Sequence, residues 1–244
     1  MKIDTVLSPR ELPSLAQADL RETVCVVFDV LRATSTFVTA LQNGAREIIP
    51  VGEISEALEI KKQRSEVLLG GERNGLRISN EGIEFDFGNS PREYTAEKVA
   101  GKTIVSTTTN GTRALKACAG ARGVLAASFL NLTATAQFMQ AARFENVLLV
   151  CAGTRENASL EDILCAGALC ELLLSKAGVK LSDPAQAAHA AFESLKYDLA
   201  AAVCNSENAQ RLLAIPPLRG DVQFCLQYDL FPIVAKMNAG VISV

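Results

Sequence analysis

The chain has 244 residues, 49% of them hydrophobic, which is enough to form one large α/β domain or two small ones. Its formal net charge of -3 creates no overall basic field, which argues against nucleic acid as a partner. No apolar run is long enough to span a bilayer and the first residues lack a signal-peptide pattern, so we expect a cytoplasmic protein without a membrane partner.

Cysteine and histidine usage excludes several kinds of site. The seven cysteines lie in apolar runs such as VCVVF and LLVCAG, which is typical of small buried side chains rather than of a disulfide framework. The single histidine, His189, lies in an alanine-rich helical pattern. A zinc site built from several imidazoles and a Ser-His-Asp triad are therefore both disfavoured.

The stretch from 24 to 45 is the most informative one in the N-terminal half. A strand and a short helix precede it, and residues 24 to 28 then form a continuous apolar run typical of a strand covered on both faces. Asp29 follows directly. The polar side chains that come next stand where a helix should begin: Arg32, Thr34, Ser35 and Thr36.

Two interpretations of this turn stay open. Helix N-termini offer unpaired N–H groups, and hydroxyls with Arg32 would add donors for an anion such as phosphate. Alternatively, Thr34 or Ser35 only caps the helix and Asp29 only solvates a turn.

The following elements predict the fold class. Residues 46 to 51 and 66 to 71 read as strands separated by a helix over 53 to 65, and strands and helices continue to alternate up to residue 195. This pattern predicts an α/β fold with a largely parallel sheet and helices on both faces. We expect one domain, with two lobes over about 1–130 and 131–244 as the alternative. From 203 to 244 we expect a polar helix and then short strands near a sheet edge, around FCLQYD, IVAKM and VISV.

A long stretch from about 70 to 95 interrupts this alternation. It contains five glycines and shows no strand or helix period, and long loops inside compact domains are usually functional. We expect a lid or wall of an active site. Its candidate residues follow the strand that ends at 71 or surround the turn at Pro91: Glu72, Arg73, Asn74, Asn89 and Arg92.

Residues 101 to 121 repeat the arrangement of the first polar turn. A strand through Ile104 and Val105 leads into hydroxyl-rich and amide residues and then into a helix. GKT at 101 to 103 is not a P-loop, because it precedes its strand. The candidate anion-binding residues here are Thr108, Thr109, Asn110, Gly111, Thr112 and Arg113.

A third strand, residues 146 to 153, ends in CAGT and is followed by a long apolar helix. Ser159 and Asp162 fit a capping box at the start of that helix. Glu161 and Asp162 could equally help to bind a metal ion at the same sheet edge.

Together, DVLRATST, GERNG, GNSPREY, STTTNGTR and CAGT with SLED resemble the 2-phosphosulfolactate phosphatase family. The resemblance covers about residues 1 to 175. It implies a Mg²⁺-dependent phosphatase that hydrolyses 2-phospho-3-sulfolactate to 3-sulfolactate in coenzyme M biosynthesis. It also implies a small substrate carrying phosphate, sulfonate and carboxylate groups.

Site roles can be assigned from the chemistry of such a reaction. Mg²⁺ prefers carboxylate and phosphate oxygens, and we expect Asp29, Glu72 and Asp162 as ligands, in that order. Asp29, Arg32 and Glu72 form the expected catalytic set. The guanidinium groups of Arg32, Arg73 and Arg113 would share the anionic groups of the substrate.

The nucleophile is expected to be a metal-activated water molecule. An aspartyl phosphatase would need a second Asp where Leu31 stands, and the nearest Cys and Arg pairs are spaced too closely for a cysteine phosphatase. Asp29 or a threonine hydroxyl remains a possible covalent carrier. A phosphatase of another hydroxy acid or sugar, a non-catalytic phosphate-binding module and a homo-oligomer also remain open.

Overall fold

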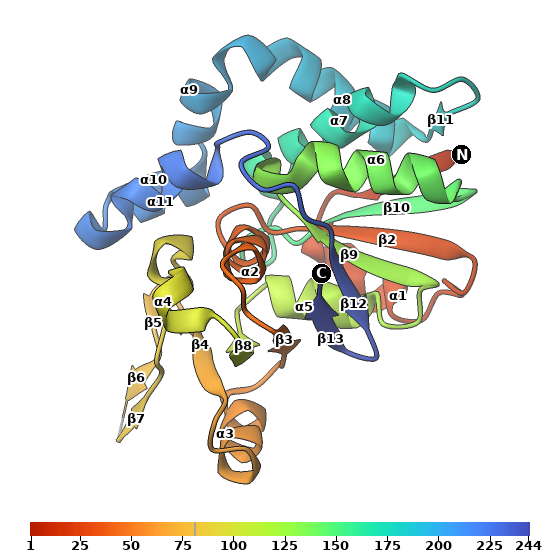
Figure 1. Cartoon of the computed structure of the whole chain (residues 1–244). Helices are drawn as coiled ribbons and strands as arrows, with labels where there is room; N and C mark the ends of the chain where they lie inside the picture. The colour runs from red at the N-terminus through yellow and green to blue at the C-terminus, as the bar shows by residue number, and fades with distance from the viewer. Residues whose placement is uncertain (81) are drawn as a thin grey trace.

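The strand and helix alternation expected from the sequence is present in the structure, a computed structural model that describes residues 1–80 and 82–244 (Figure 1). Within the described residues, eleven strands form one sheet: β1 (Lys2–Val6), β2 (Thr23–Phe28), β3 (Glu47–Pro50), β4 (Leu68–Arg73), β5 (Leu76–Arg77), β8 (Thr103–Thr107), β9 (Gly123–Ala127), β10 (Asn146–Cys151), β11 (Lys180–Leu181), β12 (Ala235–Asn238) and β13 (Val241–Ser243). A separate ribbon consists of β6 (Ser79–Asn80) and β7 (Ile83–Glu84).

Helices connect these strands, and several consecutive helices make up much of the C-terminal half of the chain. They are α1 (Leu12–Leu15), α2 (Ala33–Gln42), α3 (Ile54–Gln63), α4 (Ala96–Val99), α5 (Gly111–Ala117), α6 (Leu132–Ala142), α7 (Leu160–Leu174), α8 (Asp183–Leu195), α9 (Leu199–Cys204), α10 (Glu207–Leu213) and α11 (Arg219–Cys225). The expected α/β class is therefore confirmed.

The sheet consists of two parallel blocks joined by a C-terminal hairpin. One block has the order β11-β1-β10-β2-β9 and the other the order β3-β8-β4, with β5 paired antiparallel to β4 at the edge. Between the blocks, β12 pairs antiparallel with β9, and β13 pairs antiparallel with β3. The prediction that the C-terminal strands lie near a sheet edge is wrong, because β12 and β13 occupy its interior.

The backbone conformation of the two loop residues between β12 and β13 explains why this hairpin has so short a loop. Ala239 and Gly240 both have positive φ, 48° and 81°, as a two-residue hairpin loop with the right-handed twist of the strands requires. The inward side chains Ala235 and Ile242 are fully buried. FCLQYD, expected to be a strand, lies in α11 and the turn after it.

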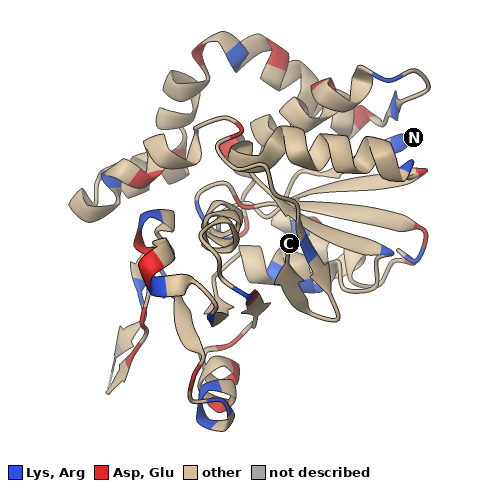
Figure 2. Ribbon diagram, viewed as in Figure 1, with Lys and Arg blue, Asp and Glu red and all other residues tan. Residues whose placement is uncertain are grey.

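Strand β2 shows why the sequence predicted cover on both faces. Val24, Val26 and Phe28 belong to a core with side chains of α6, α7 and α8, whereas Cys25 and Val27 belong to a second core with α2 and α5. In Figure 1, α6, α7 and α8 lie on one side of β2, β9 and β10, and α5 lies on the other. These strands are uncharged along their length in Figure 2, since helices cover both of their faces.

The stretch from 70 to 95 contains more regular structure than its sequence indicated. Strand β4 runs on to Arg73 and turns back into β5, and the β6–β7 ribbon follows. Gly71 is required where β4 passes β8, since a Cβ there would stand 2.2 Å from the Thr107 carbonyl oxygen. Glu81, inside this stretch, lies outside the described residues.

Two further expectations can be compared with the structure. All seven cysteines are free, and six of them are buried, as expected for small core side chains. Across residues 1–80 and 82–244, no helix combines the length and apolar character needed to cross a bilayer.

Candidate active site

The carboxyl ends of four strands surround one small polar pocket of about 50 Å³. The ends of β2 and β10 come from one parallel block, and those of β4 and β8 from the other. Strand-end residues, segments that follow them and α10 form its lining: Asp29, Leu31, Arg32, Glu72, Asn74, Gly75, Asn89, Thr109, Asn110, Gly153, Thr154, Arg155, Arg211 and Leu212. Seven residues of the predicted site are in this lining: Asp29, Arg32, Glu72, Asn74, Asn89, Thr109 and Asn110.

Asp29 lies at the floor of the pocket, directly after β2. Its Oδ1 accepts a hydrogen bond from the backbone N–H of Ala33 at 3.1 Å, at the start of α2. Its other oxygen, Oδ2, has no hydrogen-bond donor among the described residues. Gly111 lies against Oδ2, since a Cβ there would be 2.7 Å away. The side chain is thus fixed through one oxygen and offers the other to a ligand.

Glu72 forms the opposite wall, at the end of β4. Its Oε2 accepts from the Gly75 N–H at 2.6 Å, and its Oε1 accepts from both the N–H and the hydroxyl of Thr109 at 2.8 Å. The carboxylate therefore joins the turn after β4 to the turn after β8. This contact brings the two predicted polar segments together.

Arg32 is held by a C-terminal acid that the sequence did not suggest. Its Nη1 lies 2.7 Å from Asp221 Oδ2, and its Nη2 donates to the Gly75 carbonyl at 2.6 Å. Both side chains of the ion pair are almost completely buried. Ser90 donates to the second oxygen of Asp221 at 2.6 Å. Helix α11 thus locks Arg32 and the 88–92 turn into the site.

The hydroxyls after Asp29 hold the protein's own backbone. Thr34 accepts from the Asp29 N–H, Ser35 donates to the Val30 carbonyl and Thr36 donates to the Asn89 carbonyl, at 2.8–3.0 Å. All three side chains are buried behind the pocket. They shape the turn, and their predicted contact with substrate stays a prediction.

In the second hydroxyl-rich turn, some residues line the pocket and others hydrogen-bond to the surrounding protein. Thr109 faces the pocket beside Glu72, and Asn110 bonds the Ala152 and Arg155 carbonyls through Nδ2 and the Arg155 N–H through Oδ1. Thr108 and Thr112 bond to each other through side chains and backbone. Asn110 therefore joins the end of β8 to the loop after β10.

Asp162 connects the ends of two strands. Its Oδ1 accepts from the Val30 N–H at 2.8 Å and its Oδ2 from the Gly153 N–H at 2.9 Å. Ser159 is the N-cap residue of α7 but makes no side-chain cap hydrogen bond. Its hydroxyl lies 2.7 Å from that of Thr154 instead. The capping-box interpretation of this pair is wrong because tertiary contacts occupy both side chains.

The remaining predicted arginines point to other partners. Arg73 donates to the Gly52 carbonyl and to the Thr107 hydroxyl, at 3.2 and 3.0 Å. Arg113 forms a surface ion pair with Glu156 at 2.5 Å. Arg92 is half exposed and lies 3.7 Å from Asp221. None of these three is in the pocket lining, so their predicted role in substrate binding is untested.

Burial raises the pKa of three acids around the floor. It raises the pKa of Asp29 to about 7, opposed by the Ala33 hydrogen bond and supported by the charges of Glu72 and Glu161. Burial also raises the pKa of Asp162 and that of Glu161. In the part of the chain that the structure describes, no three His, Cys, Asp or Glu side chains are arranged to hold a metal ion together.

Sequence reasoning missed the residues supplied by the C-terminal helices and by the loop after β10. Arg155 follows the CAGT strand end, so a search of all strand ends could have found it. The sequence suggests Glu161 only as a metal ligand, whereas its carboxylate accepts hydrogen bonds from Asn208 at 2.7 Å and from Ser206 at 3.1 Å. Asp221 and Arg211 carry no sequence signal, because only the chain path places α10 and α11 here.

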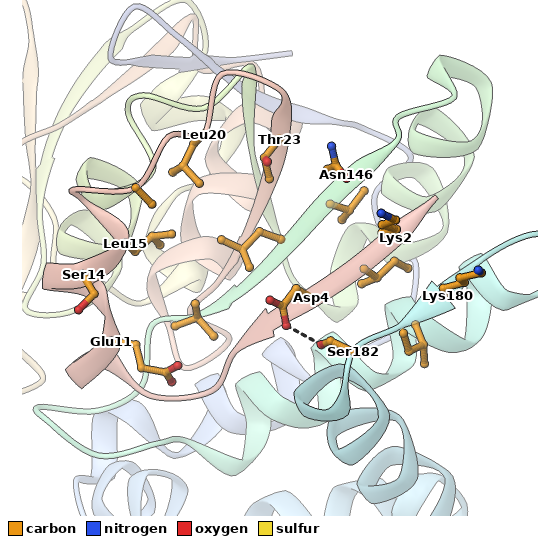
Figure 3. A pocket seen from close by; sticks show the side chains of 16 residues that line it. Lys2, Asp4, Glu11, Ser14, Leu15, Leu20, Thr23, Asn146, Lys180 and Ser182 are labelled. Carbon is orange, nitrogen blue, oxygen red and sulfur yellow. Dashed lines mark hydrogen bonds between the residues drawn. The ribbon is translucent and has the colours of Figure 1, made fainter.

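A larger cavity of about 740 Å³ lies away from this site, over one face of β1, β10 and β11 (Figure 3). Aliphatic side chains such as Leu15 and Leu148 are part of its lining. Lys2 and Lys180 lie toward one end of it and Glu11 at the other. Its volume is greater, but it lies on a sheet face and lacks the acid and arginine combination of the small pocket. Ligands of α/β sheets bind at the carboxyl ends of strands, so we assign function to the small pocket.

The fold and the pocket define an α/β enzyme with a buried, acid- and arginine-lined site at converging strand ends. A sequence model described as 2-phosphosulpholactate phosphatase matches residues 10–240. The chain belongs to this family, whose members are phosphoric monoester hydrolases.

Individual relatives agree with this assignment. A probable 2-phosphosulfolactate phosphatase of Caldanaerobacter subterraneus subsp. tengcongensis is 43% identical over 231 residues, which cover 94% of this chain and 93% of the relative. One from Thermotoga maritima is 46% identical over 216 residues, covering 88% and 89% of the two chains. One from Clostridium tetani is 35% identical over an alignment of 247 positions that covers both chains fully.

Proposed function

We propose that this protein hydrolyses 2-phospho-3-sulfolactate to 3-sulfolactate and phosphate with the aid of Mg²⁺. The relatives carry the name of this activity, and the pocket has the carboxylates and guanidinium groups that such a substrate needs. The observation that carries the proposal is Asp29. It is a buried acid fixed through one oxygen, and its other oxygen is available beside Glu72 and Arg32.

The oxygen donors of the pocket fit Mg²⁺. This ion needs only one or two carboxylates, because it keeps several waters and takes phosphate oxygens from its substrate. Asp29 would hold it through Oδ2, and Glu72 is the second candidate, with Oε2 accepting a single N–H. Asp162 is the weakest candidate, because both of its oxygens already accept backbone N–H groups. When bound, Mg²⁺ would neutralise charge on the phosphoryl group and activate the attacking water molecule.

The protein's own groups would bind and orient the phosphoryl group. The pocket of about 50 Å³ leaves room for a small polar group such as a phosphoryl group. Arg32 lines the buried pocket in an orientation fixed by Asp221 and the Gly75 carbonyl, and its preorganised guanidinium would stabilise phosphoryl charge there. Asn74, Asn89 and Thr109 supply neutral polar groups along the wall.

A phosphate-release assay tests the proposal. The substrates are 2-phospho-3-sulfolactate, 2-phospholactate, 3-phosphoglycerate and glucose 6-phosphate, each with MgCl₂ or with EDTA. We expect Mg²⁺-dependent release that is fastest from 2-phospho-3-sulfolactate. Faster release from another member of the panel would make that compound the better candidate substrate. Equal rates with MgCl₂ and with EDTA would show that the reaction does not need Mg²⁺. If the folded protein releases phosphate from no member of the panel, the proposed phosphatase activity is refuted.

Two broader statements depend on this activity. A role in coenzyme M biosynthesis and a cytoplasmic location are part of the proposal. Deleting the gene in the source organism and measuring phosphosulfolactate would test the first, and cell fractionation would test the second.

A further inference from the structure

A second cavity of about 410 Å³ adjoins the candidate active site. The loop after β10, the start of α7 and the segment from 205 to 211 form its walls. Thr154, Arg155 and Arg211 line both this cavity and the small pocket, so the two spaces share one boundary. A ligand whose phosphoryl group fills the small pocket would extend past these residues into the larger space.

The two arginines on this boundary, like Arg73, form no ion pair within the described chain. Among the described residues, neither Arg155 nor Arg211 forms an ion pair, whereas Arg32, Arg92 and Arg113 each do. The Nε of Arg211 is buried and has no hydrogen-bond acceptor within the described chain. A buried guanidinium N–H that lacks an acceptor has lost its hydration without compensation, and an oxyanion at this point would supply the missing acceptor.

Arg211 is also held in place by other side chains. Its Nη2 donates to Asn208 Oδ1 at 2.9 Å. The Nδ2 of Asn208 donates in turn to Glu161 Oε1 at 2.7 Å and to the Leu31 carbonyl at 3.0 Å. Nη2 is therefore anchored, while Nε has no acceptor and Nη1 makes no hydrogen bond within the described chain, so both N–H groups can donate to an oxyanion.

Arg155 stands at the mouth of the same space. Its backbone has a φ of 56°, in the left-handed region, and Asn110 fixes it by bonding both its N–H and its carbonyl. Its exposed side chain adds a second positive charge to the lining that it shares with Arg211. The boundary between the two cavities thus carries two cations from unrelated parts of the chain.

We propose that Arg211, assisted by Arg155, binds a second oxyanion of the substrate, a sulfonate or carboxylate on its alcohol part, in the 410 Å³ cavity. This inference rests on the proposed phosphatase function and names the residues that select its substrate class. It assigns the second anion to residues other than Arg73 and Arg113, whose guanidinium groups contact Gly52, Thr107 and Glu156.

Steady-state kinetics of Arg211→Met and Arg211→Lys test the proposal. Four phosphomonoesters are compared: 2-phospho-3-sulfolactate, 2-phospholactate without the sulfonate, 2-(phosphooxy)propane-1-sulfonate without the carboxylate, and isopropyl phosphate with neither. We expect Arg211→Met to lower kcat/KM about 10- to 100-fold for substrates that carry the recognised anion, mainly through KM. For isopropyl phosphate kcat/KM should change less than twofold, and Arg211→Lys should recover part of the loss.

The comparison between substrates decides the outcome. If only the sulfonated or only the carboxylated substrate is sensitive, that group is the one bound. An equal loss on all substrates, or no loss on any, overturns the proposal. Arg21→Met is the matched control, since the Arg21 side chain is 82% exposed and, among the described residues, pairs with Asp19 alone.

A binding measurement separates this proposal from the enzymatic one. The increase in melting temperature caused by 3-sulfolactate is measured for wild type and for Arg211→Met. A shift lost in the variant supports the anion site even if wild type hydrolyses none of the four esters, in which case only the phosphatase proposal fails. Equal shifts in both proteins refute the anion site.

Discussion

Replacing Asp29 by Asn tests the site through stability as well as turnover. Asparagine is nearly isosteric, and its Oδ1 can still accept the Ala33 N–H, so the start of α2 should stay intact. The substitution removes the negative charge of the Asp29 carboxylate, which burial disfavours. We expect Asp29→Asn to lose phosphatase activity and, without Mg²⁺, to be more stable than wild type at pH 8.

The expected size follows from the pKa of Asp29, which burial raises from the ordinary 3.8 to about 7. At about 1.36 kcal/mol per pKa unit, this rise corresponds to about 4 kcal/mol. Between pH 4 and pH 7 the folded protein keeps a proton that the unfolded chain has lost, so wild-type stability falls as pH rises through this window. Asparagine does not titrate, and the variant escapes that loss.

Urea unfolding of both proteins in EDTA from pH 5 to pH 8 measures the difference. The advantage of the variant should grow by about 3 kcal/mol over this range, or about 6 to 12 °C in melting temperature for a chain of this size. Asp198→Asn, at an exposed position, serves as the control for the loss of a carboxylate. An advantage that is constant with pH, a less stable variant at pH 8, or near-normal turnover would refute the reasoning.

Three further predictions concern the same site. Arg32→Met should destabilise the fold by about 3–5 kcal/mol in denaturant unfolding, because it leaves Asp221 buried without its cation; a loss below 1 kcal/mol would show that the pair is dispensable. Gly111→Ala should reduce turnover at least tenfold, since its Cβ would stand 2.7 Å from Asp29 Oδ2, whereas Gly120→Ala, with open space around it, should have normal activity. Thermal stabilisation by MgCl₂ should increase from pH 6 to pH 8 in wild type, as the carboxyl with a pKa of about 7 ionises, and should be absent in Asp29→Asn.

The sequence by itself determined the fold class and the polar turns of the site. The uninterrupted apolar run of β2 required cover on both faces, and the Asp29, Glu72 and Thr109 segments each followed such a strand. These signals are local, because a strand buried on both faces is a continuous apolar run and its end is marked by the polar residues that follow directly in the sequence. The turns at Asp29, Glu72 and Thr109 do line one pocket.

Only the tertiary structure decided which side chains face the ligand and which hold the protein together. Thr34 and Asp162 satisfy backbone groups, and Arg113 pairs with Glu156 at the surface. Asp221 and Arg211 reach the site from helices more than 175 residues after Asp29 in the sequence. Hydrogen-bond partners and ion pairs of this kind depend on the path of the whole chain. No local pattern records them, and for that reason the choice among arginines could not be made from sequence.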